Sequence, residues 1–162
     1  MKKLKVIVID DEMLIRKLIR MKMDTKRLNL EVAGEYVNGA AALQELREIR
    51  PDIVISDICM PEADGLLFSE ECVKLFPEIK IILVTGYDDF EYARKALKLG
   101  VEDYLSKPIP VDELIGIVSR CVQKFRHARE NDYQELEHQI RKLLMYEDTD
   151  NVDVTASGQS WG

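Results

Sequence analysis

Residues 53–57 read IVISD, a short β-branched run that ends in an aspartate. The run has no alternation of apolar and polar residues, which is typical of a strand that a parallel sheet buries on both faces. It follows Arg50-Pro51, and a residue before proline disfavours the helical region, so the preceding helix is expected to end there. The segment therefore predicts an α/β protein with an acidic side chain at the end of a buried strand.

Segments of the same two kinds alternate on either side of this run. Short apolar runs predict further strands at 6–9, 30–37, 79–85 and 103–105. Apolar residues at helical spacing predict helices at about 13–24, 65–76 and 111–125, with two more after Asn38-Gly39 and before Gly100. Five strands alternating with five helices predict a doubly wound parallel sheet with right-handed crossovers.

Composition suits one domain with an extension. The chain has 162 residues, of which 46% are hydrophobic and 33% charged. No run approaches the roughly 18 apolar residues of a membrane helix, and the short apolar run near the N-terminus ends in two aspartates, unlike a signal peptide. Cys59, Cys72 and Cys121 form no C-x-x-C pair, which favours reduced thiols. We expect a cytoplasmic protein that has no membrane partner.

The charge balance bears on nucleic-acid binding. Net charge is −7, with 20 basic and 22 acidic residues in 1–126 and 3 basic and 8 acidic residues in 127–162. Neither part has the basic balance of a nucleic-acid binder. If the parent protein binds DNA, the module that does so is expected to lie outside this chain.

Charged and polar residues stand at the predicted strand ends. Asp10 and Asp11 follow the first strand, Asp57 ends the third, Thr85 ends the fourth and Lys107 follows the fifth. In doubly wound sheets the functional site lies outside these carboxyl ends. One such aspartate alone is more often a helix N-cap. Three together repel each other unless a cation lies among them, and Mg²⁺ prefers such oxygen ligands.

Metal-assisted phosphoryl transfer uses all of these residues. An ionised Asp57 is a competent nucleophile toward phosphorus and would give an aspartyl phosphate. The metal would offset repulsion between the incoming anion and the carboxylates. Lys107 would supply a charged donor, and Thr85 could give its hydroxyl to another phosphoryl oxygen.

Four motifs in order resemble the receiver family of two-component response regulators. They are Val8-Ile9-Asp10-Asp11-Glu12, Asp57-Ile58-Cys59-Met60-Pro61 with Asp64-Gly65, Thr85-Gly86, and Lys107-Pro108. The resemblance covers about residues 3–126 and implies a flavodoxin-like sheet of strand order 2-1-3-4-5. Residues 85–93 and 100–105 are similar to receivers joined to AraC-type DNA-binding domains.

The resemblance implies a role for each site residue. Asp57 would be the phosphorylation site, fed by a sensor histidine kinase. Asp11 and Asp57 would ligate Mg²⁺ with the backbone carbonyl of Cys59, and Asp10 would act mostly through a metal-bound water. Lys107 would pair with the phosphoryl group. The domain would accept phosphate, control an effector that is expected to be transcriptional, and not act as a turnover enzyme.

The resemblance also implies a switch. Thr85 would move toward the phosphate and Tyr104 would rotate in behind it, changing the face formed by the fourth helix, fifth strand and fifth helix. Lys107-Pro108 would be a cis peptide. Another interpretation stays open, since a strand tyrosine is often a half-buried packing residue. The likeness to AraC-linked receivers has its own alternative, in which Tyr87, Phe90 and Tyr92 only pack against or shield the fourth helix.

A helical extension is predicted beyond the receiver domain of residues 1–126. In residues 127–146, apolar side chains follow a 3–4 spacing: Tyr133, Leu136, Ile140, Leu143 and Leu144. A helix this short is marginal alone. It is expected to dock, to remain a frayed linker, or to pair with a partner helix, so a homodimer could form through it or through the switch face. Residues 147–162 are polar and expected to be disordered.

Three alternatives remain open at this stage. A phosphohydrolase with an aspartate nucleophile would need a second acid two residues on, where this chain has Cys59. A flavin-binding module would need a loop rich in Ser, Thr and Gly after the first strand, where Asp10-Asp11-Glu12 would repel a phosphate. A stand-alone receiver that acts by protein contact fits the sequence as well.

Overall fold

The computed structural model describes residues 2–58, 65–86 and 90–158. Cys59 and Tyr87 lie outside the described residues, so the expectations for them have no structural counterpart here. The side chains of Phe90 and Tyr92 also lie outside the described part.

Five parallel strands form one sheet in the order β2-β1-β3-β4-β5, which confirms the predicted order. They are β1 (Leu4–Ile9), β2 (Leu30–Tyr36), β3 (Ile53–Asp57), β4 (Lys80–Thr85) and β5 (Asp103–Ser106). All five residues of β3 are buried, as the absence of apolar–polar alternation in this segment predicts. The strand order reverses between β1 and β3, which places a crevice at their carboxyl ends.

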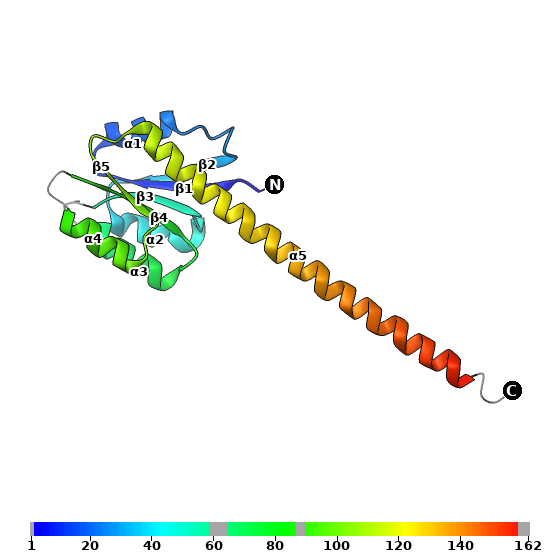
Figure 1. Ribbon diagram of the computed structural model, residues 1–162. Coiled ribbons are helices and arrows are strands. Elements are labelled where there is room, and N and C mark those ends of the chain that lie inside the picture. Colours follow the sequence, from blue (N-terminus) through cyan, green and yellow to red (C-terminus); the bar gives the residue numbers. More distant parts are fainter. Residues whose placement is uncertain (1, 59–64, 87–89, 159–162) are drawn as a thin grey trace. The chain divides into compact units, whose positions relative to one another are not determined.

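Five helices alternate with the strands. They are α1 (Met13–Lys22), α2 (Gly39–Ile49), α3 (Gly65–Leu75), α4 (Phe90–Leu99) and α5 (Val111–Gly158). Figure 1 shows α2, α3 and α4 on one face of the sheet, with α1 and the first turns of α5 on the other. This arrangement confirms the doubly wound α/β fold.

Successive residues of each strand point to opposite faces of the sheet and pack against the helices there. One core cluster joins Ile7, Ile9 and Val54 to apolar side chains of the helices α2, α3 and α4, such as Phe68. The intervening strand residues, Val6 among them, are also buried and point to the opposite face because side chains alternate along a strand. Both faces therefore hold the sheet rigid behind its carboxyl edge.

The helix boundaries follow the local signals. Asn38 caps α2, since its side-chain oxygen accepts a hydrogen bond from Ala41 N at 2.8 Å. Arg50 ends α2 in the left-handed region, with φ of 50°, directly before Pro51. Gly100 has φ of 94° after α4, a conformation that glycine adopts without strain. The predicted helix ends at Pro51 and Gly100 are confirmed.

The chain divides into two compact units, Met1–Val122 and Gln123–Gly162. In the second unit the helical backbone of α5 continues to Gly158, beyond residue 146 where disorder was expected. Once a helix is nucleated, each further residue adds a hydrogen bond at little extra cost, so extension can outrun the apolar pattern. The stripe Tyr133, Leu136, Ile140, Leu143 and Leu144 is exposed, by 48% to 70%.

Among the described residues, no helix is both long enough and apolar enough to cross a membrane.

Candidate functional site

The predicted strand-end residues meet at the carboxyl edge of the sheet. Asp10, Asp57 and Thr85 are buried there, with relative exposures of 2%, 5% and 2%. Asp11 and Glu12 belong to the same edge and are exposed. Two buried carboxylates and two exposed ones form an acidic cluster at the strand ends, where doubly wound sheets have their crevice, and we call this cluster the acidic crevice.

Lys107 lies between the two buried carboxylates. Its Nζ is 3.1 Å from Oδ2 of Asp57, 3.3 Å from Oδ2 of Asp10 and 3.9 Å from Oε1 of Glu12. The lysine side chain is 23% exposed, so solvent reaches part of it. The sequence predicted only that Asp10, Asp57 and Lys107 lie at strand ends. In the structure the charged atoms of these three residues are in contact.

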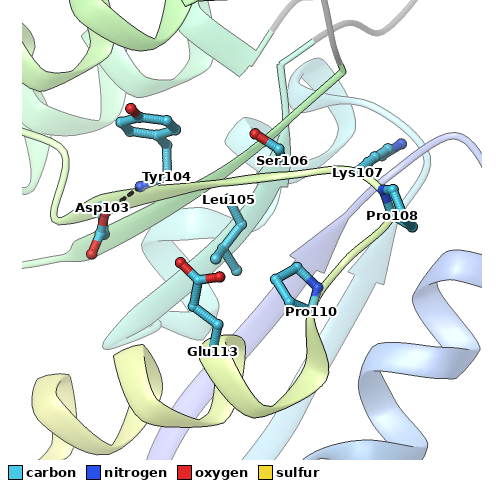
Figure 2. Close-up of a pocket in the computed structure, with 8 residues that line it drawn as sticks. All are labelled: Asp103, Tyr104, Leu105, Ser106, Lys107, Pro108, Pro110 and Glu113. Carbon is cyan, nitrogen blue, oxygen red and sulfur yellow. Dashed lines mark hydrogen bonds between the residues drawn. The ribbon is translucent and has the colours of Figure 1, made fainter.

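The β5–α5 connection fixes where this lysine starts. Lys107 N donates to the carbonyl of Thr85 at 2.7 Å, and the Lys107-Pro108 peptide is cis, as predicted. Figure 2 shows Lys107 at the end of β5, immediately before Pro108. The backbone bond to β4 and the proline together hold the lysine at the same edge as Asp57.

Charge and burial oppose each other at the crevice. The pKa of Asp10 is raised, chiefly because burial penalises its charged form and also because Asp57 lies beside it. The Glu12 amide and Lys107 counteract part of this effect. Burial tends to lower the pKa of Lys107, but its hydrogen bond to Asp57 and the charges of Asp57 and Asp10 outweigh burial and raise it. A single ammonium group therefore leaves an excess of negative charge.

The donor set fits a hard divalent cation. One carboxylate oxygen each from Asp10, Asp11 and Glu12 lie within 4.8 Å of one another. Mg²⁺ prefers oxygen ligands, and it needs partial solvent access because it keeps several of its bound waters. The remaining expected ligand, the carbonyl of Cys59, lies outside the described residues.

The main chain around Asp57 is tightly enclosed. Ile58 N donates to the Val84 carbonyl at 3.0 Å, and Gly65 N donates to the Ile58 carbonyl at 2.7 Å. A Cβ atom placed on Gly65 would lie 2.1 Å from the Asp57 carbonyl oxygen, so a side chain at this position would collide with the backbone. Gly65, which the sequence presents only as part of a motif, therefore has a steric role behind Asp57.

The two residues predicted to form a switch, Thr85 and Tyr104, lie on the neighbouring strands β4 and β5. The Thr85 hydroxyl donates to the carbonyl of Leu105 on β5 at 3.3 Å. Tyr104 is partly buried and packs against the core cluster on the α2, α3 and α4 face. The side chains of Tyr104 and Leu105 leave opposite sides of β5 (Figure 2). Both the switch and the packing interpretation of Tyr104 are compatible with this placement.

A pocket of about 570 Å³ follows β5 toward the lysine. Its lining includes Tyr104, Ser106, Lys107, Pro108 and Glu113 (Figure 2). The pocket thus connects the lysine of the crevice with the strand that carries the tyrosine.

Sequence reasoning missed Arg16. Its guanidinium donates to the Asp10 carbonyl at 2.6 Å and lies 3.8 Å from Glu35 on β2. The sequence indicates this role only weakly. Arg16 follows Ile15 and precedes Ile19, which is buried, by three residues, so it lies near the inward side of α1. An arginine near a buried face usually indicates a specific polar partner.

Comparison with known proteins shows which family this sequence matches. The family model described as the response regulator receiver domain matches residues 6–119. The chain is 35% identical over 112 residues to the uncharacterized transcriptional regulatory protein YhcZ of Bacillus subtilis, covering 69% of this chain and 52% of YhcZ. It is 31% identical over 116 residues to the chemotaxis protein CheY of Thermotoga maritima, covering 72% of this chain and 95% of CheY.

Solved structures show the same likeness. The receiver domain of AraT, a response regulator from Geobacillus stearothermophilus, is 36% identical with a TM-score of 0.74, covering 78% of this chain and 98% of that one. A two-component transcriptional regulator AraC from Clostridium phytofermentans is 25% identical with a TM-score of 0.69, covering 80% and 99%. The chain spans about half the length of YhcZ and a third or less of YesN and NtrC, which are also regulators.

Proposed function

Because this chain belongs to the response regulator receiver family, we propose that Asp57 is the residue that accepts its phosphoryl group. The observation that carries the proposal is the Lys107 ammonium held 3.1 Å from the Asp57 carboxylate at a crevice lined by further acids. Phosphorylation of an aspartate with Mg²⁺ is a general property of the family. Assigning the roles to individual residues is our proposal.

The reaction needs a nucleophile and neutralised charge. An Asp57 carboxylate oxygen forms a bond to phosphorus while the bond from phosphorus to the donor's imidazole nitrogen breaks, and the freed imidazole takes a proton from solvent. Lys107 lies where it can pair with a phosphoryl oxygen, and its existing contact with Asp57 keeps it there. The product is an aspartyl phosphate.

Mg²⁺ completes the site in this proposal. Asp11, Asp57 and the Cys59 carbonyl would hold it directly, and Asp10 would act mostly through a bound water. Bound there, the ion would neutralise charge on the transferring group. The close approach of the Asp10, Asp11 and Glu12 carboxylate oxygens supports a cation at this place.

Signal output starts from the Thr85 hydroxyl. A phosphoryl group adds about 1.5 to 2 negative charges and three strong acceptors. These acceptors compete with the Leu105 carbonyl that the hydroxyl now meets at 3.3 Å, a long hydrogen bond for an O–H donor. When Thr85 turns toward the phosphate, Tyr104 can repack and change the α4, β5 and α5 face. We propose that this local charge event biases a two-state element.

The partners follow from the same reasoning. We propose a sensor histidine kinase as donor, a cytoplasmic location, and a signalling rather than a turnover role. Transcriptional output would come from a DNA-binding module, since regulators such as YhcZ are about twice the length of the matched region. We also propose a homodimer, through the α4, β5 and α5 face or through the apolar stripe of the second unit.

Intact-protein mass tests the proposal. The wild-type chain would be incubated with Mg²⁺ and acetyl phosphate beside Asp57→Asn. We expect one phosphoryl group on the wild type, none on the variant, and none on the wild type in EDTA. A phosphoryl group that persists on Asp57→Asn would overturn the assignment of Asp57.

A further inference from the structure

Arg16 connects three segments behind the acidic crevice. It belongs to α1, its Nη1 donates to the main-chain carbonyl of Asp10 at 2.6 Å, and its Nε lies 3.8 Å from Oε1 of Glu35 on β2. The arginine side chain is only 13% exposed. A guanidinium that is so enclosed has lost most of its hydration, so these contacts must replace it.

The carbonyl that Arg16 holds belongs to the peptide leading to Asp11. Asp10 N donates to the Tyr36 carbonyl at 3.0 Å, and Oδ1 of Asp10 accepts from Glu12 N at 2.9 Å. With Arg16 on the carbonyl, the amide, carbonyl and carboxylate of Asp10 are all bonded. Because a peptide unit is planar, fixing its carbonyl also fixes the direction in which the chain enters Asp11.

We propose that Arg16 is a positioning residue for the cation. It fixes the peptide between Asp10 and Asp11 so that both carboxylates are set to receive Mg²⁺ before the ion arrives. The inference rests on the proposed function, which supplies Mg²⁺ as the ion. Groups that orient metal ligands from behind commonly change metal affinity by about 10- to 100-fold when they are replaced.

Electrostatics predicts the opposite sign, which makes the proposal testable. Arg16 is a positive charge near the acids, so Coulomb repulsion alone predicts that its removal would tighten cation binding. Positioning predicts that removal weakens binding. Lysine would keep the charge and three donors on a single nitrogen atom, but it lacks the planar fork whose separate nitrogen atoms can meet a carbonyl and a carboxylate together.

Arg20 provides a matched control. It lies one turn later on α1 and donates to Oε2 of the same Glu35 at 2.6 Å. Its side chain is 57% exposed. Among the described residues, the arginine bonded to the Asp10 carbonyl is Arg16 and not Arg20. Replacing Arg20 therefore removes a similar charge and a contact to Glu35 while leaving the Asp10 peptide held.

The experiment measures cation affinity on the full chain without phosphorylation. Free Mn²⁺ would be followed by electron paramagnetic resonance, with Mg²⁺ as competitor, for wild type, Arg16→Met, Arg16→Lys and Arg20→Met. We expect Arg16→Met to raise the Mg²⁺ dissociation constant by about tenfold. Arg16→Lys should restore part of the affinity, and Arg20→Met should bind like wild type.

A second readout separates positioning from a general loss of structure. The Mg²⁺ concentration for half-maximal phosphorylation by acetyl phosphate should rise in Arg16→Met by the same factor as the dissociation constant. The rate at saturating Mg²⁺ should stay near that of the wild type, because Asp57 and Lys107 are unchanged. If Arg16→Met does not fold, Arg16→Lys takes its place, with weaker binding than wild type as the expected result.

The outcomes distinguish this inference from the function it rests on. Equal or tighter Mg²⁺ binding by Arg16→Met, or an equal loss in Arg20→Met, would overturn the positioning role alone. A wild-type chain that binds neither Mn²⁺ nor Mg²⁺ would overturn the proposed metal site, and the inference with it.

Discussion

Lys107 is the residue on which the charge balance of the crevice depends. It contacts Asp57 and Asp10, both of which are buried, through one ammonium group. Removing one partner of a fully buried ion pair costs about 3–5 kcal/mol, because the other charge is left uncompensated. Lys107 is 23% exposed, so solvent screening should reduce this cost.

We therefore expect Lys107→Met to lower the free energy of unfolding by about 1–3 kcal/mol at neutral pH in EDTA. Mg²⁺ should recover part of the loss by supplying positive charge to the same carboxylates. Urea unfolding with and without Mg²⁺ measures both effects, and Lys17→Met on the exposed side of α1 is the control. Equal stability of Lys107→Met and Lys17→Met would contradict this view of the crevice.

Tyr36 makes the fold sensitive to alkaline pH. Burial, followed by its hydrogen bond to Glu45, raises the pKa of Tyr36 to about 12 from 10.0. The unfolded chain thus releases this proton first as pH rises. Tyr36 should cost stability progressively from about pH 10 to pH 12 and no further above that range.

The comparison of wild type with Tyr36→Phe isolates this titration from that of the lysines. The difference in unfolding free energy between the two should be constant below pH 9 and should shift against the wild type between pH 10 and 12, the interval between the two pKa values. A difference that stays flat across that interval would show that the hydroxyl titrates normally in the folded state.

At the scale of helices and strands, α2 shows how a local signal places a boundary. The Asn38 side chain accepts from Ala41 N at 2.8 Å and satisfies one of the amides that a helix start leaves unpaired. We expect Asn38→Ala to lower the unfolding free energy by about 1 kcal/mol. Gln44→Ala, at an exposed position of the same helix, is the control. Thermal melts of the two would contradict the capping role if both variants lost the same amount.

Sequence patterns predicted a strand or a helix boundary correctly where a single local feature was enough to determine it. The β-branched run of β3 is buried on both faces, so its composition alone indicated a parallel strand. The end of α2 before Pro51 was predicted correctly, although Arg50 leaves the right-handed helical region for the left-handed one and not for the extended region that a following proline favours. The helical extension past residue 146 was missed because its polar sequence carries no burial signal.

Some residues of the site could be predicted from the sequence and others could not, for the same reason. Asp10, Asp57, Thr85 and Lys107 could be predicted to converge because parallel strands end at one edge. The contact of Arg16 with the Asp10 carbonyl could not, because it depends on how α1 packs against β1 and β2. The steric role of Gly65 behind Asp57 likewise depends on how closely the start of α3 approaches the end of β3.

For the whole molecule, the exposed stripe of the second unit bears on assembly. Leu136 and Ile140 are 55% and 48% exposed on α5, and exposed apolar rows at 3–4 spacing are typical of helices that pair. If the homodimer uses this stripe, Ile140→Lys should shift a concentration-dependent dimer to monomer, whereas Gln134→Lys on the same helix should not. Sedimentation equilibrium measures both.

An unchanged dimer in Ile140→Lys would exclude the stripe and leave the α4, β5 and α5 face as the proposed interface. A monomer at all concentrations in the wild type, with and without phosphorylation, would contradict the proposal of a homodimer altogether.

If Asp57 carries the phosphoryl group as an acyl phosphate, chemical trapping should identify it. The phosphorylated chain would be treated with borohydride, which reduces an acyl phosphate and converts the aspartate to homoserine, and then mapped by peptide mass spectrometry. We predict homoserine at position 57 and aspartate retained at positions 10 and 11. Homoserine at either of those positions, with Asp57 intact, would contradict the account.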